Sequence, residues 1–447
     1  MDISGYKGRS LKLISESEVS VGDTISVKTN DDEFMGILMP RYELADENHI
    51  VIKLKSGYNI GIKTANIQSI TKIIEGSGQN VSVETFKKEH LKEAEVLPKI
   101  ALISTGGTIT SKIDYRTGGV SSALSASELY ASIPELEKYA SIDTDVILNE
   151  YSENLKPEHW TMIANKIAEK VKSDMYCGII VSHGTDTMHY TASALSFALQ
   201  NLPIPVVIVG AQRSSDRPSS DAALNLISAT IFATKSQFSG VFVAMHAGPS
   251  DETIACHIGT RVRKNHTSRR DAFESIDITP VAMIKDDEIE IQTEQPEINL
   301  QKRNADSRSF LVKPDFNSKV ILLKYHPGFD PNLITYAIMS GYKAIIVEGT
   351  GLGHISRECF PQIQNAVKSG VMIFMTSQCI WGRIQMTVYD TGRDLLDMGV
   401  IPLSNMMSET ATVKAMWVLA NNKETESIEK MMQENMANEI TRVIPIS

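Results

Sequence analysis

The sequence predicts an α/β protein with two doubly wound sheets, preceded by a small β-barrel domain of the SH3-like kind. Short strand-like runs separated by Asn, Asp and Gly fill residues 1–72. From Lys99 onward, unbroken apolar runs each end abruptly in small or polar residues, and segments of helical periodicity lie between them. Alternation of buried strands and helices is typical of doubly wound sheets.

The composition limits the classes of protein to which the chain can belong. Its 447 residues correspond to roughly three domains of about 150 residues each. Lys and Arg total 44 and Asp and Glu total 54, and the resulting net charge of −10 argues against a free-standing nucleic-acid binder. No apolar run approaches the roughly 18 to 20 residues of a membrane span, and the first residues do not resemble a signal peptide, so we expect no membrane association.

Cysteine usage indicates a reducing compartment. The four cysteines lie far apart and show no CxxC spacing (Cys177, Cys256, Cys359 and Cys379). We therefore expect neither a disulfide framework nor a metal site, and a cytoplasmic location.

Residues 1–72 are predicted to form the N-terminal β-barrel domain. The runs ISVKTN, EFMGILMPRY, HIVIKLKS and YNIGIKTANI begin about ten residues apart, which suits a small barrel. Residues 73–97 contain a Gly-Ser-Gly break and a charged stretch, so we expect a linker with one short helical turn.

Residues 98–290 are predicted to form the first α/β domain. The runs IALIS, GIIVS, VVIVG and VFVAM show no polar alternation, as expected of parallel strands buried on both faces. In WTMIANKIAEKV, the residues at i, i+3, i+4, i+7, i+8 and i+11 are apolar and define one helix face, namely Trp160, Ile163, Ala164, Ile167, Ala168 and Val171. Ligands of such sheets bind at the carboxyl ends of the strands.

The second α/β domain is predicted at residues 318–447. Residues 286–317 are polar, strand-poor and broken by Pro296 and Pro314, so we expect an inter-domain linker over 291–317. The runs VILLKY, AIIVEG and VMIFMTS then repeat the strand pattern, and ATVKAMWVLANN predicts a helix near the end.

The first cluster with catalytic potential is Thr105-Gly106-Gly107-Thr108. Two glycines after a strand allow a sharp turn and a close approach of backbone to ligand, and the threonines offer a hydroxyl nucleophile. A simple strand-to-helix turn or a phosphate-binding loop is the alternative, although the GxxxxGK[ST] pattern of a P-loop is absent.

The second cluster, His183-Gly184-Thr185-Asp186-Thr187, also follows a predicted strand. A Thr beside an Asp can present a hydroxyl and a carboxylate to one substrate. Helix capping by Asp186 or Thr185 is an equally good interpretation.

The third cluster carries five Lys or Arg residues and no acid between Arg261 and Arg270. A solvated basic turn is the ordinary interpretation, and a nucleic-acid contact is a further one. One lysine that points inward beside another cation would have a lowered pKa and could act as a base.

Taken together, these clusters resemble the L-asparaginase/glutaminase amidohydrolase family over roughly residues 98–440. Its paired signatures correspond to STGGTIT at 104–110 and IIVSHGTDTMHYTASAL at 179–195. The resemblance assigns the nucleophile to Thr108 and the other catalytic positions to Tyr115, Thr185, Asp186 and Lys264. It also assigns substrate binding to Ser152 and Glu153 and the oxyanion-hole N–H to Ala211. On chemical grounds Lys264, Thr185 and Asp186 form a second hydroxyl–base–acid set, so either threonine could attack; we favour Thr108, whose Gly-rich loop could close over substrate.

The extension at residues 1–97 is similar to that of the D subunit of the archaeal-type glutamyl-tRNA(Gln) amidotransferase. The segments PRYELADENHIVIKLKSGYNIGI, HTSRRDAF and CIWGRIQMTVYDTGRDLLDMGVIP carry this resemblance. It implies a protein without a cofactor of its own, which hydrolyses glutamine and hands ammonia to the E subunit. The E subunit then uses ATP and Mg²⁺ to convert Glu-tRNA(Gln) into Gln-tRNA(Gln). The resemblance further implies a D dimer within a D2E2 heterotetramer, in which tRNA is contacted mainly by the partner.

One loop departs from the pattern of simple asparaginases. They carry Asn at the end of a GxGxGN loop that completes the neighbouring protomer's site, where this chain has His354. The acidic residue that follows in those enzymes has Tyr389 and Asp390 as its nearest candidates.

Two other functions are compatible with the same sequence. A stand-alone L-asparaginase with an unrelated N-terminal appendage would share the amidohydrolase signatures. A non-catalytic scaffold is disfavoured, because all five polar catalytic positions carry the required residue types.

Overall fold

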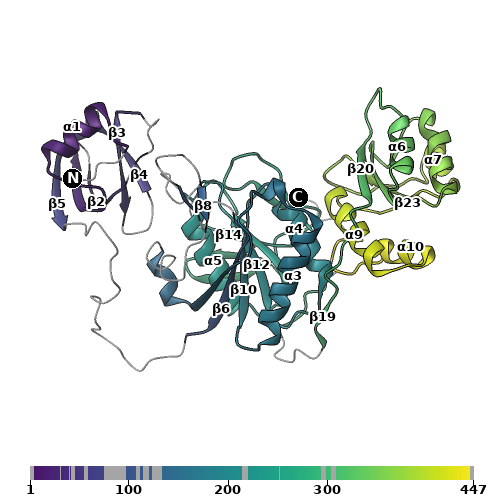
Figure 1. Ribbon diagram of the computed structural model, residues 1–447, viewed down its shortest axis with the longest axis horizontal. Coiled ribbons are helices and arrows are strands. Elements are labelled where there is room, and N and C mark those ends of the chain that lie inside the picture. The colour runs from purple at the N-terminus through teal and green to yellow at the C-terminus, as the bar shows by residue number, and fades with distance from the viewer. Residues whose placement is uncertain are drawn as a thin grey trace.

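A computed structural model describes residues 5–30, 32–39, 41, 46–54, 59–74, 97–106, 111–113, 120–122, 133–213, 220–250, 252–292, 298–303 and 309–442. Figure 1 shows an N-terminal β module, a central α/β domain and a C-terminal α/β domain, in the order of the chain. The predicted fold class is confirmed. No helix within the described ranges combines the length and apolar character that crossing a bilayer requires.

The N-terminal module is an antiparallel sheet with the strand order β4-β3-β2-β1-β5. Its strands are β1 (Thr24–Thr29), β2 (Glu33–Leu38), β3 (His49–Leu54), β4 (Asn59–Lys63) and β5 (Ile67–Ile74), with a 3₁₀ turn η1 (Thr64–Asn66) before the last. Pairing of β5 with β1 returns the end of the module to its first strand.

A helix that the sequence analysis did not anticipate precedes these strands. Helix α1 (Gly8–Glu16) buries Ile14 completely against the module's apolar core. Ser10 and Ile14, four residues apart, are its buried face. So short an amphipathic segment is stabilised mainly by packing on the sheet.

The central sheet has the order β18-β17-β14-β13-β12-β10-β6-β9. Its parallel strands are β6 (Lys99–Ser104), β9 (Ser141–Val146), β10 (Gly178–Ser182), β12 (Pro205–Val209) and β13 (Gly240–His246). Every residue of β10 and β12 is buried, as the absence of alternation predicted. Three antiparallel strands extend one edge, namely β14 (Ile254–Ile258), β17 (Ala282–Lys285) and β18 (Glu288–Ile291).

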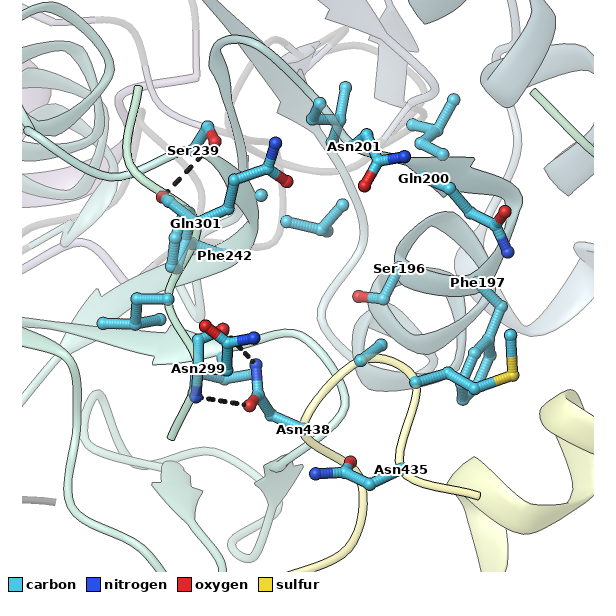
Figure 2. A pocket seen from close by; sticks show the side chains of 18 of the residues that line it. Ser196, Phe197, Gln200, Asn201, Ser239, Phe242, Asn299, Gln301, Asn435 and Asn438 are labelled. Carbon is cyan, nitrogen blue, oxygen red and sulfur yellow. Dashed lines mark hydrogen bonds between the residues drawn. The ribbon is translucent and has the colours of Figure 1, made fainter. Parts of the chain in front are cut away.

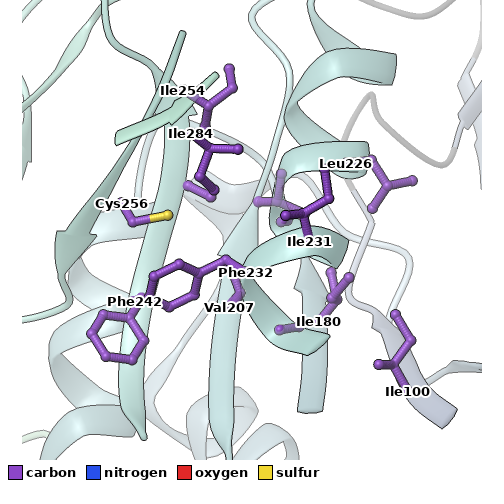
Figure 3. Close-up of a cluster of buried hydrophobic side chains, with 14 of the residues drawn as sticks. Ile100, Ile180, Val207, Leu226, Ile231, Phe232, Phe242, Ile254, Cys256 and Ile284 are labelled. Carbon is purple, nitrogen blue, oxygen red and sulfur yellow. The ribbon is translucent and has the colours of Figure 1, made fainter. Parts of the chain in front are cut away.

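Helices cover both faces of this sheet. Helices α3 (Pro157–Lys172) and α4 (Met188–Ala198) pack on one face, and the buried residues of α3 are the six that the periodicity predicted. Helix α5 (Ala222–Lys235) packs on the other face, where Phe232 and Phe242 meet edge to face with ring centroids 5.0 Å apart (Figure 3). Complete burial of Ile163 or Ile167 contributes on the order of 2 kcal/mol each.

Short elements complete the central domain. Among the described residues, they include the antiparallel pairs of β7 (Ser111–Ile113) with β8 (Val120–Ser122) and of β15 (Val262–Lys264) with β16 (Phe273–Ser275), and the 3₁₀ turns η3 (Pro134–Lys138) and η4 (Ser152–Asn154). In addition, β11 (Leu199–Gln200) pairs with β19 (Leu311–Val312). Strands β18 and β19 lie inside the stretch 286–317 that was predicted to be strand-poor, so short strands occur near both ends of this stretch. The alternating sequence EIEI at 288–291 was the signal for the first.

The C-terminal domain is a parallel sheet with the order β20-β21-β22-β23. Its strands are β20 (Val320–Lys324), β21 (Ala344–Gly349), β22 (Met372–Ser377) and β23 (Ile401–Pro402). Its helical elements are α6 (Asn332–Met339), η6 (Arg357–Cys359), α7 (Phe360–Lys368), α8 (Asp390–Asp397), α9 (Ser408–Asn421) and α10 (Thr425–Gln433). Ile345 and Ile346 contribute to apolar clusters on opposite faces, as both-sided burial requires.

Helix α9 joins this domain to the central domain. Thr410 lies 3.1 Å from Ser193 of α4 (Oγ1 to Oγ) and donates to the Thr260 carbonyl at 3.0 Å. Trp417 stacks on Phe197 of α4, with ring centroids 6.0 Å apart. The C-terminal domain therefore rests on the helix that directly follows the His183–Thr187 cluster.

Candidate active site

The carboxyl edge of the central sheet gathers the polar loops that the sequence singled out. Thr105 donates to the Ser182 carbonyl through both its backbone N–H, at 3.1 Å, and its hydroxyl, at 2.9 Å. The Thr105 carbonyl accepts from Glu150 N–H at 3.3 Å, and the Val209 carbonyl accepts from His183 N–H at 2.9 Å. These bonds join the loops after β6, β9, β10 and β12 at one edge, where doubly wound sheets bind ligands.

Lys264 forms a compact polar set with two residues of the loop after β10. Its Nζ donates to Thr185 Oγ1 and to Asp186 Oδ1, at 2.8 Å in both cases. The Lys264 side chain is 8% exposed and the Asp186 side chain is 67% exposed, so the set lies at a solvent boundary. Because Thr185 accepts from the ammonium, its hydroxyl proton is left to donate to another group.

The basic cluster divides into residues with different environments. Arg261 is fully buried and donates to Asn405 at the domain boundary, at 2.9 Å to its carbonyl and at 3.0 Å to Oδ1. Arg263 Nε donates to Glu409 Oε1 at 2.7 Å, whereas Arg269 pairs with Asp271 on the exposed side of the hairpin. The solvated-turn interpretation therefore holds for Arg269 but not for Arg261, and Lys264 is the lysine that points inward.

A buried histidine holds the turn that carries Thr185 and Asp186. His183 Nδ1 lies 2.6 Å from the Gly184 carbonyl, and Nε2 lies 2.8 Å from Thr191 Oγ1. Burial lowers the pKa of His183 to about 4, so the ring is neutral at pH 7. Helix capping does not explain the cluster, since the N-cap residue of α4 is Thr187 and it makes no capping bond.

Ser152 and Glu153 lie beside this turn. Thr187 Oγ1 donates to the Ser152 carbonyl at 2.6 Å. A Cβ on Gly184 would lie 2.8 Å from the Ser152 Cβ, so only glycine permits this approach. Ser152 is buried and Glu153 is exposed in η4.

Thr108 and Tyr115 lie outside the described residues. Gly106 immediately precedes that segment, with φ of +109°, and a Cβ there would lie 2.4 Å from the Glu150 carbonyl oxygen. The first glycine of the predicted nucleophile loop is therefore required by both its backbone conformation and its packing.

Ala211 lies at the end of β12, next to the Thr185 turn. The preceding residue, Gly210, packs so closely that a Cβ would lie 2.7 Å from the His183 carbonyl oxygen and 3.1 Å from Thr185 Cγ2. Ala211 itself is buried. The structure thus brings Ser152, Thr185, Asp186, Ala211 and Lys264 to one edge of the sheet.

His354 lies in the C-terminal domain, in the loop after β21, where its ring contacts other residues of that domain. Its Nδ1 is 3.2 Å from Thr391 Oγ1, and its ring meets the exposed Tyr389 edge to face at 5.4 Å. The exposed Asp390 pairs with Arg357 at 2.6 Å. The backbone N–H of Thr391 and the Arg357 charge lower the pKa of Asp390.

The sequence analysis missed a buried ionic group at the domain boundary. Glu409 begins α9 and pairs with Arg263; burial would raise the pKa of Glu409, but the Arg263 charge and hydrogen bond outweigh burial and lower it. His189 of α4 interacts with Glu409, and burial lowers the pKa of His189 to about 4. An acid at the start of the largely apolar segment ETATVKAMWVLA was the available signal.

The larger cavities lie elsewhere. A cavity of about 440 Å³ is lined by amide side chains, among them Asn299, Gln301 and Asn438, and by Ser239 and Gly240 at the amino end of β13 (Figure 2). Asn299 N–H donates to Asn438 Oδ1 at 2.9 Å. This cavity is at the opposite end of the parallel strands from Lys264, so it is not part of the candidate active site.

Family models match three consecutive parts of the chain. "GatD N-terminal domain" matches residues 19–73, "Asparaginase, N-terminal" matches 99–297, and "Glutaminase/Asparaginase C-terminal domain" matches 319–432. Among solved structures, the thermostable L-asparaginase of Thermococcus kodakarensis is similar at 33% identity with a TM-score of 0.67, and it covers 77% of this chain and 99% of its own. L-asparaginase I of Vibrio cholerae is similar at 28% identity with the same TM-score.

Curated relatives match nearly the whole chain. The D subunit of the glutamyl-tRNA(Gln) amidotransferase of Sulfurisphaera tokodaii is 45% identical over 98% of this chain and 95% of its own length. The D subunit of the Pyrococcus furiosus enzyme is 46% identical over 96% of this chain and 97% of its own. With an asparaginase core and the additional N-terminal module, the chain belongs to the D-subunit family of glutamyl-tRNA(Gln) amidotransferases.

Proposed function

We propose that this chain is the glutaminase subunit of a tRNA-dependent amidotransferase that converts Glu-tRNA(Gln) into Gln-tRNA(Gln). The observation that carries the proposal is the Lys264–Thr185–Asp186 set, in a chain that matches its D-subunit relatives from the N-terminal module onward. An ammonium that donates to both a hydroxyl and a carboxylate brings together groups that are suited to amide chemistry.

The proposed reaction has two steps and uses Thr108 as the nucleophile. Thr108 Oγ attacks the side-chain amide carbon of glutamine, its proton passes to the departing nitrogen, and ammonia leaves. Water then hydrolyses the ester, which releases glutamate and restores the threonine hydroxyl. The Ala211 N–H donates to the oxyanion of both tetrahedral intermediates.

The remaining site residues bind the substrate and position the reacting groups. Glu153 and Asp186 receive the α-ammonium of glutamine, and Ser152 and Thr185 donate to its α-carboxylate. Lys264 holds Thr185 and Asp186 in place, and Tyr115 assists Thr108.

The ammonia is passed to a partner, the E subunit, which activates the glutamate on tRNA with ATP and Mg²⁺. We propose a cytoplasmic D2E2 assembly, in which His354 of one D protomer completes the pocket of the other. In this assembly the partner makes most of the contacts to tRNA, so a net charge of −10 on this chain is compatible with a tRNA-dependent reaction.

Substitution of the nucleophile tests the mechanism. Thr108→Ala in the D–E complex should abolish glutamine-dependent Gln-tRNA(Gln) formation and leave formation from ammonium chloride unchanged, because only the hydrolytic step needs the hydroxyl. Full glutamine-dependent activity in the variant would refute the assignment of Thr108.

A stand-alone L-asparaginase is the second candidate, supported by the likeness to solved asparaginases over 77% of this chain. Deletion of residues 1–90 separates the two functions. A free-standing enzyme should keep its turnover, whereas an amidotransferase component should lose coupling to its partner or to tRNA.

A further inference from the structure

Two buried side chains in the first turn of α5 hold the backbone on both sides of Ala211. The Asp221 carboxylate accepts from Gln212 N–H through Oδ2 and from Arg213 N–H through Oδ1, at 2.9 Å each. Asn225 Nδ2 donates to the Gly210 carbonyl at 2.9 Å. Both side chains are completely inaccessible to solvent.

The amide of Asn225 is held in one orientation. Its Nδ2 also donates to Asp221 Oδ2 at 3.1 Å, so both amide hydrogens are used and Oδ1 is left as an acceptor. His246 Nδ1 lies 2.6 Å from that Oδ1. Nδ1 must therefore carry the imidazole proton and donate it.

His246 is the last residue of β13 and is completely buried, so the strand and the surrounding protein fix the position of its ring. Hydrogen bonds thus run from β13, through Asn225 and Asp221, to the three polar backbone groups that flank Ala211. On its other side the same backbone packs against Thr185 through Gly210.

We propose that Asp221, Asn225 and His246 are positioning residues that aim the Ala211 N–H at the oxyanion. The inference rests on the proposed function, because it takes Ala211 as the oxyanion donor. All three side chains are completely buried, so we place their action on the backbone around Ala211 and not on the substrate itself. An oxyanion donor acts on charge that develops only in the transition state, so misplacing it lowers kcat and leaves substrate binding nearly unchanged.

A matched pair of substitutions at His246 tests the proposal in the D–E complex. His246→Asn keeps an N–H at the position of Nδ1, whereas His246→Leu removes the donor at similar volume. We expect His246→Asn to keep kcat for amide hydrolysis within about 3-fold and His246→Leu to lose about 10-fold or more, with KM changed less than 3-fold in both. Circular dichroism gives the folded fraction, so that kcat refers to folded enzyme.

Asp221→Asn is the second variant. The uncharged isostere presents an amide N–H to one of the two backbone donors and thereby breaks one of the bonds that hold the turn. We expect about a 10- to 100-fold loss of kcat, again without a matching change in KM. Wild-type kcat in His246→Leu, or a raised KM with unchanged kcat in either variant, would overturn the proposal.

Rates are measured with glutamine and with asparagine in parallel. A wild-type complex that hydrolyses asparagine but not glutamine contradicts the proposed function, and the network is then assessed on asparagine. If the wild-type complex hydrolyses neither amide, both the proposed function and the positioning role of the three residues are contradicted. If wild type and His246→Leu both hydrolyse glutamine at the normal rate, the positioning role is refuted while the proposed function stands.

Discussion

The Lys264 ammonium donates to a hydroxyl and a carboxylate at equal distances, although Lys264 lies in β15 and its two partners lie 79 and 78 positions earlier, in the loop after β10. Most of the Lys264 side chain is buried, while Asp186 remains largely in solvent. The lysine is thus fixed by the fold, and its partners face the region that the substrate must enter.

Removal of this ammonium should affect catalysis far more than stability. In Lys264→Met the stem is replaced by an apolar chain of similar shape, and Asp186 keeps its solvation. We expect kcat for glutamine hydrolysis to fall at least about 100-fold, because Thr185 and Asp186 lose the group that holds them in place, with the melting temperature nearly unchanged. Lys285→Met, at an exposed lysine, is the control and should retain full activity. Activity within 3-fold of wild type in Lys264→Met would remove the lysine from the mechanism.

Burial of His257 should make unfolding depend on pH. Burial lowers the pKa of His257 in the folded chain to about 4, against about 6.5 when unfolded. Between these values the unfolded chain binds more protons, so stability is present above about pH 6.5 and is lost as the pH falls toward 4. Urea titrations at pH 7 and pH 5 measure how much unfolding free energy each protein loses over this range. We expect the loss in His257→Asn to be about 2 kcal/mol smaller than the loss in wild type. The exposed His326→Asn is the control, and equal losses in all three proteins would contradict the prediction.

The candidate site residues could be predicted from the sequence where they belong to short clusters of polar residues. Thr185 and Asp186 follow a buried strand directly, and Lys264 was one of five basic residues in a single cluster. The sequence could not distinguish Lys264 from the fully buried Arg261 without the family resemblance, since both lie in the same polar stretch. Asp221 and Asn225 have no signal of their own, because their role depends on how α5 meets β12.

The β15–β16 hairpin and the residue before it contact both the C-terminal domain and the candidate active site. Arg261 and Arg263 face the domain boundary, whereas Val262 faces the apolar core and Lys264 faces the candidate active site, because successive side chains of a strand point to opposite sides. Arg261 binds Asn405 and Thr441 of the C-terminal domain, and Lys264 binds the loop after β10. The hairpin thus ties the position of the lysine to the packing of the two domains.

The two ends of the basic cluster should differ in their effect on stability. Arg261→Met removes a buried guanidinium with several hydrogen bonds and leaves Asp277, 3.8 Å away, without its cation. We expect a loss of about 3 kcal/mol in unfolding free energy. Arg269→Met, in an exposed pair, should leave the unfolding free energy nearly unchanged. Equal effects of the two substitutions in chemical denaturation would refute the division of the cluster.

The periodicity of apolar residues predicted which segments are helices and which are strands. It did not predict which strands pair with one another. The apolar runs and the face of α3 predicted buried strands and an amphipathic helix because burial pattern is a local property. Strands β14, β17 and β18 were not identified as an antiparallel edge, since pairing direction is decided by distant residues. Helix α1 was missed because its nine residues carry a single fully buried apolar side chain.

At the scale of the whole molecule, an asparaginase-like pair of domains carries an N-terminal module that the asparaginase models do not match. The catalytic edge belongs to the central sheet, and the C-terminal domain rests on α4 directly behind it. This organisation suits control of hydrolysis by binding events outside the pocket, because α4 connects the Thr185 turn to the domain boundary.

The most direct test of the account is ammonia release from glutamine and asparagine by the chain alone, with the E partner, and with the E partner and Glu-tRNA(Gln). The account predicts preference for glutamine and strong stimulation by the complete mixture. Rapid asparagine hydrolysis by the chain alone, indifferent to partner and tRNA, would contradict it.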